Sequence, residues 1–181
     1  GNFFFFFLMI LKRFAKPVVK LSPGIADEHL VKQKGLITKA PVRAMNLTFL
    51  ELSPEHILWD LGSGSGSISI AAASLLRKGE IYAVEKDPER IQMILENIQQ
   101  TGAYLVEPVC ANMPYGLGSL PDPDRIFMGG GLGQSSEILD CALARLKPGG
   151  KIIINTVLLE SLQRARAALE QLNLPLFILQ T

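Results

Sequence analysis

At 181 residues, with 48% hydrophobic and 19% charged residues, the chain can bury a sizeable core and is too apolar to be intrinsically disordered. The formal net charge is +1 and the basic residues are scattered, so we expect no nucleic-acid partner. Cys110 and Cys141 lie far apart, and neither His29 nor His56 completes a cluster with them. This pattern predicts two buried thiols, no metal site and a cytoplasmic protein.

The first 23 residues form an apolar segment and a linker in our prediction. Residues 3–7 are all phenylalanine, and the apolar run continues to residue 11. A run of about nine residues is too short to cross a bilayer, which takes about 20. It also lacks the positive start and the cleavage site of a signal peptide. We therefore expect no membrane partner, and we place one domain at residues 24–181.

The rest of the chain alternates short apolar strands with helices. Strands are predicted at residues 57–61, 80–85, 105–109, 125–128, 151–158 and 176–179. Helices are predicted at residues 38–52, 68–76, 87–98, 138–146 and 159–172. This alternation with short connections predicts an α/β domain with an open, mostly parallel, Rossmann-like sheet and helices on both faces.

Local signals mark the ends of several predicted helices. Thr38 is expected to cap the first helix. Asp87 followed by Pro88 is a strong start signal, because aspartate favours the N-cap and proline the first helical position. The buried face of that helix is predicted from helical spacing to consist of Ile91, Ile94, Leu95 and Ile98.

A glycine-rich turn follows the first predicted strand and opens the next helix. Gly62, Gly64 and Gly66 allow a tight turn and a close approach of a ligand to the backbone. The same glycines also fit a turn that binds nothing. Glu85 closes the second predicted strand, where an acid can accept hydrogen bonds from both hydroxyls of a ribose. Together, the turn and the acid predict a nucleoside site.

The spacing of the turn indicates which nucleoside is bound. Asp60 leads the pattern Asp-x-Gly-x-Gly-x-Gly, in which the third glycine comes one residue earlier than in the dinucleotide fingerprint. This pattern resembles the S-adenosylmethionine (SAM) motif of class I methyltransferases. In that family the turn surrounds the methionine part of the cofactor, and the acid after the second strand holds the ribose.

A more specific resemblance extends over residues 24–179. The segments that carry it are 24–28 (GIADE), 35–44 (GLITKAPVRA), 59–67 (WDLGSGSGS), 121–130 (PDPDRIFMGG) and 146–150 (LKPGG). Together they resemble the precorrin methyltransferases of cobalamin biosynthesis. The resemblance implies a SAM-dependent enzyme that methylates C15 of precorrin-6B or cobalt-precorrin-6B and releases carbon dioxide from the C12 acetate.

The resemblance also implies the residues of the cofactor site. They are Thr38, Asp60, Gly62, Ser63, Gly64, Ser65, Gly66, Glu85, Lys86, Asn112 and Met113. One departure is that the family's Gly-Asp-Ala-Pro after the third strand is here Ala-Asn-Met-Pro at residues 111–114. Asn112 can still donate and accept hydrogen bonds toward an adenine. The family also continues into a closing strand, so the last part of the sheet is expected to be truncated.

Residues toward the acceptor are predicted from charge and position. Basic groups would pair with the carboxylates of a tetrapyrrole, and glycines after the fourth strand would leave room for a flat ring. The candidates are Lys39, Arg43, Gly129, Gly130, Gly131, Asn155 and Glu160. We assign no catalytic residue, because an activated methyl donor mainly requires positioning.

Two other functions fit part of the pattern. One is a class I methyltransferase that acts on RNA or protein, and the other is a non-catalytic nucleotide-binding domain. The near-neutral charge and the absence of an Asn-Pro-Pro-Tyr type of motif after the fourth strand argue against the first. By family analogy we expect a homo-oligomer, a tetramer, which could be fused to or paired with a second precorrin methyltransferase.

Overall fold

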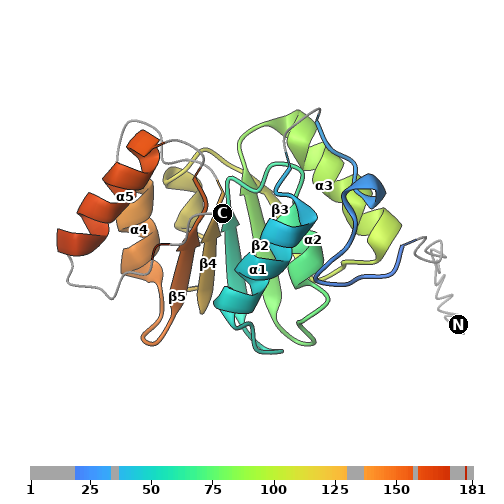
Figure 1. The fold of residues 1–181 in the computed structure, drawn as a ribbon, viewed down its shortest axis with the longest axis horizontal. Coiled ribbons are helices and arrows are strands. Elements are labelled where there is room, and N and C mark those ends of the chain that lie inside the picture. Colours follow the sequence, from blue (N-terminus) through green and yellow to red (C-terminus); the bar gives the residue numbers. More distant parts are fainter. Residues whose placement is uncertain (1–18, 34–36, 130–136, 157–158, 172–177, 179–181) are drawn as a thin grey trace, which may run out of the picture.

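The computed structural model describes residues 19–33, 37–129, 137–156, 159–171 and 178. Within these residues five strands alternate with helices (Figure 1). The strands are β1 (Ile57–Leu61), β2 (Glu80–Glu85), β3 (Val106–Cys110), β4 (Arg125–Met128) and β5 (Lys151–Ile154). The helices are η1 (Asp27–His29), α1 (Ala40–Leu50), α2 (Ser67–Ala72), α3 (Pro88–Thr101), η2 (Tyr115–Leu117), α4 (Glu137–Arg145) and α5 (Leu159–Gln171).

The five strands form one parallel sheet in the order β3-β2-β1-β4-β5. This confirms the predicted open parallel sheet. The central strand β1 pairs Leu61 with Val84 of β2 on one side and with Met128 of β4 on the other. Because all strands run the same way, their carboxyl ends share one edge, and the loops that follow them meet there.

Helices cover both faces of this sheet and enclose two apolar cores. Successive strand residues point to opposite faces, so Leu58 joins one core whereas Trp59 and Leu61 join the other. The first core contains side chains from α1, α2 and α3, including the fully buried Ile94. The second contains side chains from α4 and α5. Both helical layers predicted from the sequence are therefore present.

The structure bears out the predicted start of α3 and corrects that of α1. The Asp87 carboxylate accepts a hydrogen bond from Glu89 N–H at 2.9 Å, as an N-cap should. The N-cap of α1 is Lys39 rather than Thr38, and the Lys39 side chain makes no capping hydrogen bond. Pro41 in the first turn lacks an N–H, which removes one of the donors that a capping side chain would serve.

Two predicted buried side chains are more exposed than expected. Leu95 of α3 is 39% exposed, and Asn97 occupies the buried face of the helix in its place. The expectation of two buried thiols is wrong for Cys110, which is exposed at the end of the edge strand β3, while Cys141 is half-buried. Both cysteines are free.

Two strand ends also differ from the prediction. β3 begins and ends one residue later than expected. β5 ends at Ile154, where its partner β4 also ends, and Asn155 N–H makes a last bond to the Met128 carbonyl at 2.9 Å. The predicted strand at residues 176–179 lies almost entirely outside the described residues, as does the phenylalanine run at 3–7.

The described part of the N-terminal segment runs along the outer side of α3 (Figure 1). Val19 N–H donates to the Gln100 carbonyl at 3.3 Å, and Val19 and Leu21 pack against the first core. The last residues of the predicted linker thus lie on the domain. No helix within the described ranges is long and apolar enough to cross a membrane.

Candidate functional site

The glycine-rich turn between β1 and α2 depends on three left-handed glycines. Gly62, Gly64 and Gly66 have φ values of 70°, 58° and 76°, which other residues adopt only at a cost. The N–H groups of Gly62 and Ser63 bond to the Val84 carbonyl at 3.0 and 3.1 Å. The turn is therefore fastened to the end of β2, beside the predicted ribose-binding acid.

Asp60 lies buried beneath this turn. Its Oδ2 accepts hydrogen bonds from the N–H and the hydroxyl of Ser69, at 3.2 and 2.5 Å. Burial raises the pKa of Asp60 to about 7, the negative charge of Glu85 adds to the rise, and the two bonds from Ser69 oppose it. Asp60 thus joins β1 to α2 from within the fold, although it was predicted among the cofactor-binding residues.

Glu85 ends β2, and both of its carboxylate oxygens accept hydrogen bonds. One oxygen accepts from Gly64 N–H at 2.9 Å. The other accepts from the N–H groups of Lys86 and Asp87 at 2.9 and 3.2 Å. A carboxylate offers about four acceptor positions, so about one remains for a ligand hydroxyl. A second hydroxyl would have to share the position now used by Gly64.

Five other predicted residues reach the same edge of the sheet. Asn112 follows β3, where Ala111 N–H bonds to the Glu85 carbonyl at 3.0 Å. Gly129 N–H bonds to the Leu61 carbonyl at 3.1 Å, directly beside the turn. Asn155 follows β5 and is bonded to the end of β4. The same edge also carries Met113, which follows Asn112, and the exposed Lys86, which follows Glu85.

The structure corrects the predicted role of Arg43. This side chain is fully buried in α1, and its guanidinium binds the Asp27 carboxylate at 3.0 Å and the carbonyls of Ile25 and Thr38. All of these partners are internal, so Arg43 fixes residues 19–33, here called the lead segment, to α1 and does not present a charge to a substrate. Thr38 takes part through its backbone carbonyl.

The remaining acceptor-side candidates are dispersed. The Lys39 side chain is 64% exposed and lies 3.8 Å from the Asp27 carboxylate. Glu160 is on the surface of α5 and faces Arg164 of the same helix at 3.9 Å. This places Glu160 in an intrahelical ion pair rather than with the other candidates. Gly130 and Gly131 lie outside the described residues.

Two residues of α3 that the sequence did not single out contact the site. Arg90 approaches Glu85, with 3.7 Å between the guanidinium and a carboxylate oxygen. Asn97 donates to the Ser65 carbonyl of the turn at 2.9 Å. The available signal for Asn97 was a polar residue on an otherwise apolar helix face, between Ile94 and Ile98. The available signal for Arg90 was its position as a basic residue in the first turn of the helix that follows Glu85.

The polar atoms of the turn fit a polar ligand. Ser63 Oγ, Ser65 Oγ and Asp60 Oδ1 are buried and have no hydrogen-bond partner among the described residues. Leaving a buried polar atom unpaired costs about 1–3 kcal/mol, so a ligand with ammonium, carboxylate and hydroxyl groups would relieve that cost. In the part of the chain that the structure describes, no group of three or more His, Cys, Asp or Glu residues could hold a metal ion.

Comparison with known proteins places this site in a family. The family model described as "Precorrin methyltransferase domain" matches residues 29–180. A probable cobalt-precorrin-6B C(15)-methyltransferase (decarboxylating) from Pyrobaculum calidifontis is 38% identical over 156 residues, which cover 84% of this chain and 80% of that protein. A precorrin-6Y C(5,15)-methyltransferase [decarboxylating] from Sinorhizobium is 37% identical over 77% of this chain, but the match covers only 33% of that longer protein.

The fold gives the same result. The crystal structure of a precorrin-6Y C5,15-methyltransferase from Geobacter metallireducens is similar to this chain with a TM-score of 0.79 and 42% sequence identity. The similarity covers 82% of this chain and 79% of that one. With the parallel sheet, the glycine-rich turn and the acid at the end of β2 all in place, the chain belongs to the family of precorrin methyltransferase domains.

Proposed function

We propose that this protein is a SAM-dependent C-methyltransferase that acts on C15 of precorrin-6B or cobalt-precorrin-6B and releases carbon dioxide from the C12 acetate. The observation that carries the proposal is the pairing of the glycine-rich turn with Glu85, which is hydrogen-bonded to Gly64 across the top of the sheet. Relatives that bear this activity in their names are 38% and 33% identical to the chain.

The cofactor would be held at the carboxyl edge of β1, β2 and β3. Residues 62–66 would surround its methionine part, and the unpaired Ser63 and Ser65 hydroxyls would bind polar groups there. Glu85 would accept a ribose hydroxyl, and Asn112 and Met113 would border the adenine. SAM supplies a methyl group that its sulfonium has already activated, so the role of these residues is to bind and orient.

The acceptor would lie beside Gly129. A Cβ atom at this position would come within 3.0 Å of the Phe127 ring and 3.7 Å of the Gly62 carbonyl, so the turn and the end of β4 are close together there. Asn155 is on the same edge, and Lys39 offers an exposed ammonium to a substrate carboxylate. These residues would orient the tetrapyrrole, and we assign none of them a proton-transfer role.

We further infer a cytoplasmic homo-oligomer. Both the location and the assembly are inferred from the family to which the chain belongs. A longer relative carries the matching domain as about a third of its length, which supports fusion to, or pairing with, a second precorrin methyltransferase. Size-exclusion chromatography with light scattering would measure the assembly directly.

Calorimetry and mass spectrometry test the proposed activity. We expect the folded protein to bind SAM but not NAD, and we expect a precorrin substrate to gain one methyl group and lose carbon dioxide. A folded protein that binds no SAM would overturn the proposal. Methyl gain without decarboxylation would contradict the C15 assignment and leave a methyltransferase with another acceptor position.

Glu85→Gln tests the predicted ribose contact. The amide keeps the shape of the side chain but removes the charge and one acceptor, and hydrogen bonds to charged groups contribute about 1.5–3 kcal/mol. We therefore expect the Kd for SAM to rise on the order of 10- to 100-fold. Glu107→Gln on the exposed face of β3 is the matched control, and it should bind SAM like the wild type.

A further inference from the structure

Asn97 of α3 connects two segments that are far apart in the sequence. The side chain is completely buried. Its Oδ1 accepts from Val31 N–H at 2.7 Å, and its Nδ2 donates to the Val31 carbonyl at 2.9 Å. The same Nδ2 donates to the Ser65 carbonyl at 2.9 Å. One carboxamide therefore satisfies both backbone groups of Val31 and fixes the glycine-rich turn.

The bond to Ser65 determines the orientation of a peptide group inside the turn. The carbonyl of Ser65 and the N–H of Gly66 belong to the same planar peptide and point in opposite directions. The carbonyl bonds to Asn97, while the N–H bonds to the Ser63 carbonyl at 2.8 Å. Held from both sides, this peptide places Gly66 in its left-handed conformation at the start of α2.

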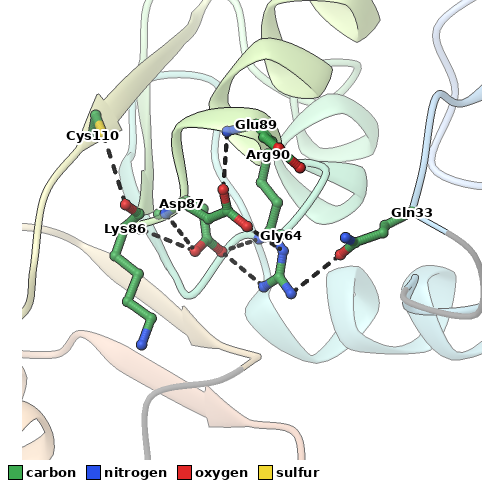
Figure 2. A network of polar contacts seen from close by, with 8 residues as sticks. Gln33, Gly64, Lys86, Asp87, Glu89, Arg90 and Cys110 are labelled. Atoms are coloured by element: carbon green, nitrogen blue, oxygen red, sulfur yellow. Dashed lines mark hydrogen bonds and ion pairs between the residues drawn. The ribbon is translucent and has the colours of Figure 1, made fainter.

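Arg90 makes a parallel connection two helical turns earlier in α3. Its guanidinium lies 3.7 Å from the Glu85 carboxylate and 3.5 Å from that of Asp87. It also donates to the Gln33 side chain at 3.3 Å (Figure 2). Gln33 follows Val31 by two residues, so α3 contacts the same short piece of the lead segment at two points and the cofactor site at two points.

We propose that Asn97 and Arg90 are positioning residues that couple residues 31–33 of the lead segment to the methyl-donor site. Asn97 couples the lead to the glycine-rich turn, and Arg90 couples it to Glu85. The proposal rests on the proposed function, because it assumes that SAM binds at the turn and at Glu85. It adds that the lead segment is part of the binding equilibrium.

The coupling has a physical basis in the bonds that are shared. The Glu85 oxygen nearest Arg90 is also the acceptor for Gly64 N–H. A ribose hydroxyl that binds this oxygen competes with Gly64 N–H and with the Arg90 guanidinium for the same acceptor. Arg90 transmits the change to Gln33, and the turn transmits it through Ser65 and Asn97 to Val31. Cofactor binding should therefore stabilise the lead segment, and disruption of the lead should weaken cofactor binding.

Asn97→Ala and Thr101→Val form a matched pair that tests Asn97. Thr101 is a buried polar residue of the same helix, but among the described residues its hydroxyl bonds only to the Asn97 carbonyl within the helix, at 2.6 Å. Both variants should lower the melting temperature. Only Asn97→Ala should raise the calorimetric Kd for SAM, by about tenfold or more, since it alone frees the turn. Equal Kd values for the two variants would overturn the role of Asn97.

Arg90→Gln and Gln33→Ala test the second connection without disturbing the core. Both side chains are partly exposed, so the variants should fold even where Asn97→Ala does not. We expect each to raise the Kd for SAM, with the larger effect at Arg90, and Arg90→Lys to restore part of it through its retained charge. Arg166→Ala, which breaks an ion pair on the surface of α5, is the control that should bind normally.

Hydrogen exchange supplies a readout that is independent of turnover. In the wild type, SAM should slow exchange at residues 62–66 and also at residues 29–33. In Arg90→Gln and Asn97→Ala, saturating SAM should still protect the turn but protect the lead less. Unchanged protection of the lead in both variants would overturn the coupling alone. A wild-type protein that binds no SAM would overturn the proposed function and this proposal with it.

Discussion

At the scale of single residues, the carboxyl group of Asp60 binds its proton more tightly than an ordinary aspartate does. Its carboxyl is fully buried, and burial raises its pKa from 3.8 to about 7. The folded protein therefore retains this proton over a pH range in which the unfolded chain has lost it. The resulting stability is fully present below about pH 4 and is lost as the pH rises through about 7.

Asp60→Asn should remove this pH dependence. Asparagine keeps an oxygen that can accept from Ser69 N–H, but it does not titrate between pH 5 and 8. We expect the free energy of unfolding of the wild type, minus that of Asp60→Asn, to fall from pH 5 to about pH 7 and to level off above it, where the folded and the unfolded wild type have both lost the proton. Urea unfolding at pH 5, 6, 7 and 8 would measure the difference, and a constant difference would contradict the raised pKa.

His56 makes the comparison with the variant necessary. Burial, followed by the nearby charge of Arg125, lowers the pKa of His56 below 6.5, so protonation of this residue opposes folding as the pH falls. Its contribution to stability therefore rises with pH, in the direction opposite to that of Asp60. Because His56 is present in both proteins, its effect cancels in the difference, and the remaining slope belongs to Asp60.

At the scale of elements, two glycines of the turn meet different surroundings. Gly64 and Gly66 both have positive φ. A Cβ atom at Gly64 would have no neighbour within 4 Å, whereas one at Gly66 would lie 3.1 Å from the Ile94 side chain of α3. Close packing of α2 against α3 thus requires glycine at position 66, while position 64 requires it only for its backbone conformation.

Gly66→Ala should therefore be more destabilising than Gly64→Ala. Each variant adds the cost of a left-handed alanine, about 1–2 kcal/mol, and Gly66→Ala must also displace Ile94. Urea unfolding of both variants measures the order. In the double variant Gly66→Ala/Ile94→Ala, the loss should be smaller than the sum of the single losses, because the added methyl fills part of the space that Ile94 leaves. Strict additivity would contradict the contact.

Strand prediction from the sequence succeeded where both ends carry a local signal. β1 and β2 have their predicted bounds, since each ends at a polar or glycine-rich turn. β5 was predicted too long, because apolar residues return at positions 157 and 158 after Asn155 and Thr156, whereas the partner strand β4 ends opposite Ile154. The length of a strand depends on its neighbour in the sheet, and a single stretch of sequence does not contain that information.

The same distinction applies to the site. The glycine-rich turn and Glu85 could be predicted because they follow strand ends in a fixed order. The contacts of Asn97 with Val31 and of Arg90 with Gln33 join residues 66 and 57 positions apart, and only the folded chain brings them together. Arg43 was assigned to the substrate because its sequence position does not reveal its internal partners.

At the scale of the whole molecule, the carboxyl and amino ends of the strands have different roles. The loops at the carboxyl ends form the candidate site. At the amino ends, the Asp124 carboxylate accepts from Ile57 N–H at 2.8 Å and from the Lys147 ammonium at 3.0 Å. Arg125 donates to the carbonyl of Leu50 at the end of α1, at 2.6 Å. The start of the family segment 121–130 therefore holds the sheet together, and only its end borders the site.

Asp124→Asn should test this division between stability and binding. The amide keeps an acceptor for Ile57 N–H but loses the charge that faces Lys147, and a partly exposed ion pair of this kind contributes about 1 kcal/mol. A weakened bond to Ile57 adds to the loss. We expect unfolding at pH 7 to be easier by about 1–2 kcal/mol. The Kd for SAM should stay at the wild-type value, because the substitution lies at the far end of the sheet.

The pH dependence of this loss should be the reverse of that at Asp60. Burial would raise the pKa of Asp124, but the bond from Ile57 and the Lys147 ammonium outweigh burial and hold the pKa below its usual value of 3.8. The contribution of Asp124 to stability is therefore present above about pH 4 and is lost as the pH falls through its lower folded pKa. The difference between the wild type and Asp124→Asn should shrink when the pH falls below about 4, relative to its value at pH 7 to 8, where the coupling of Asp124 to the nearby His56 contributes least. A weaker SAM affinity in this variant would show that the two ends of the sheet are not independent.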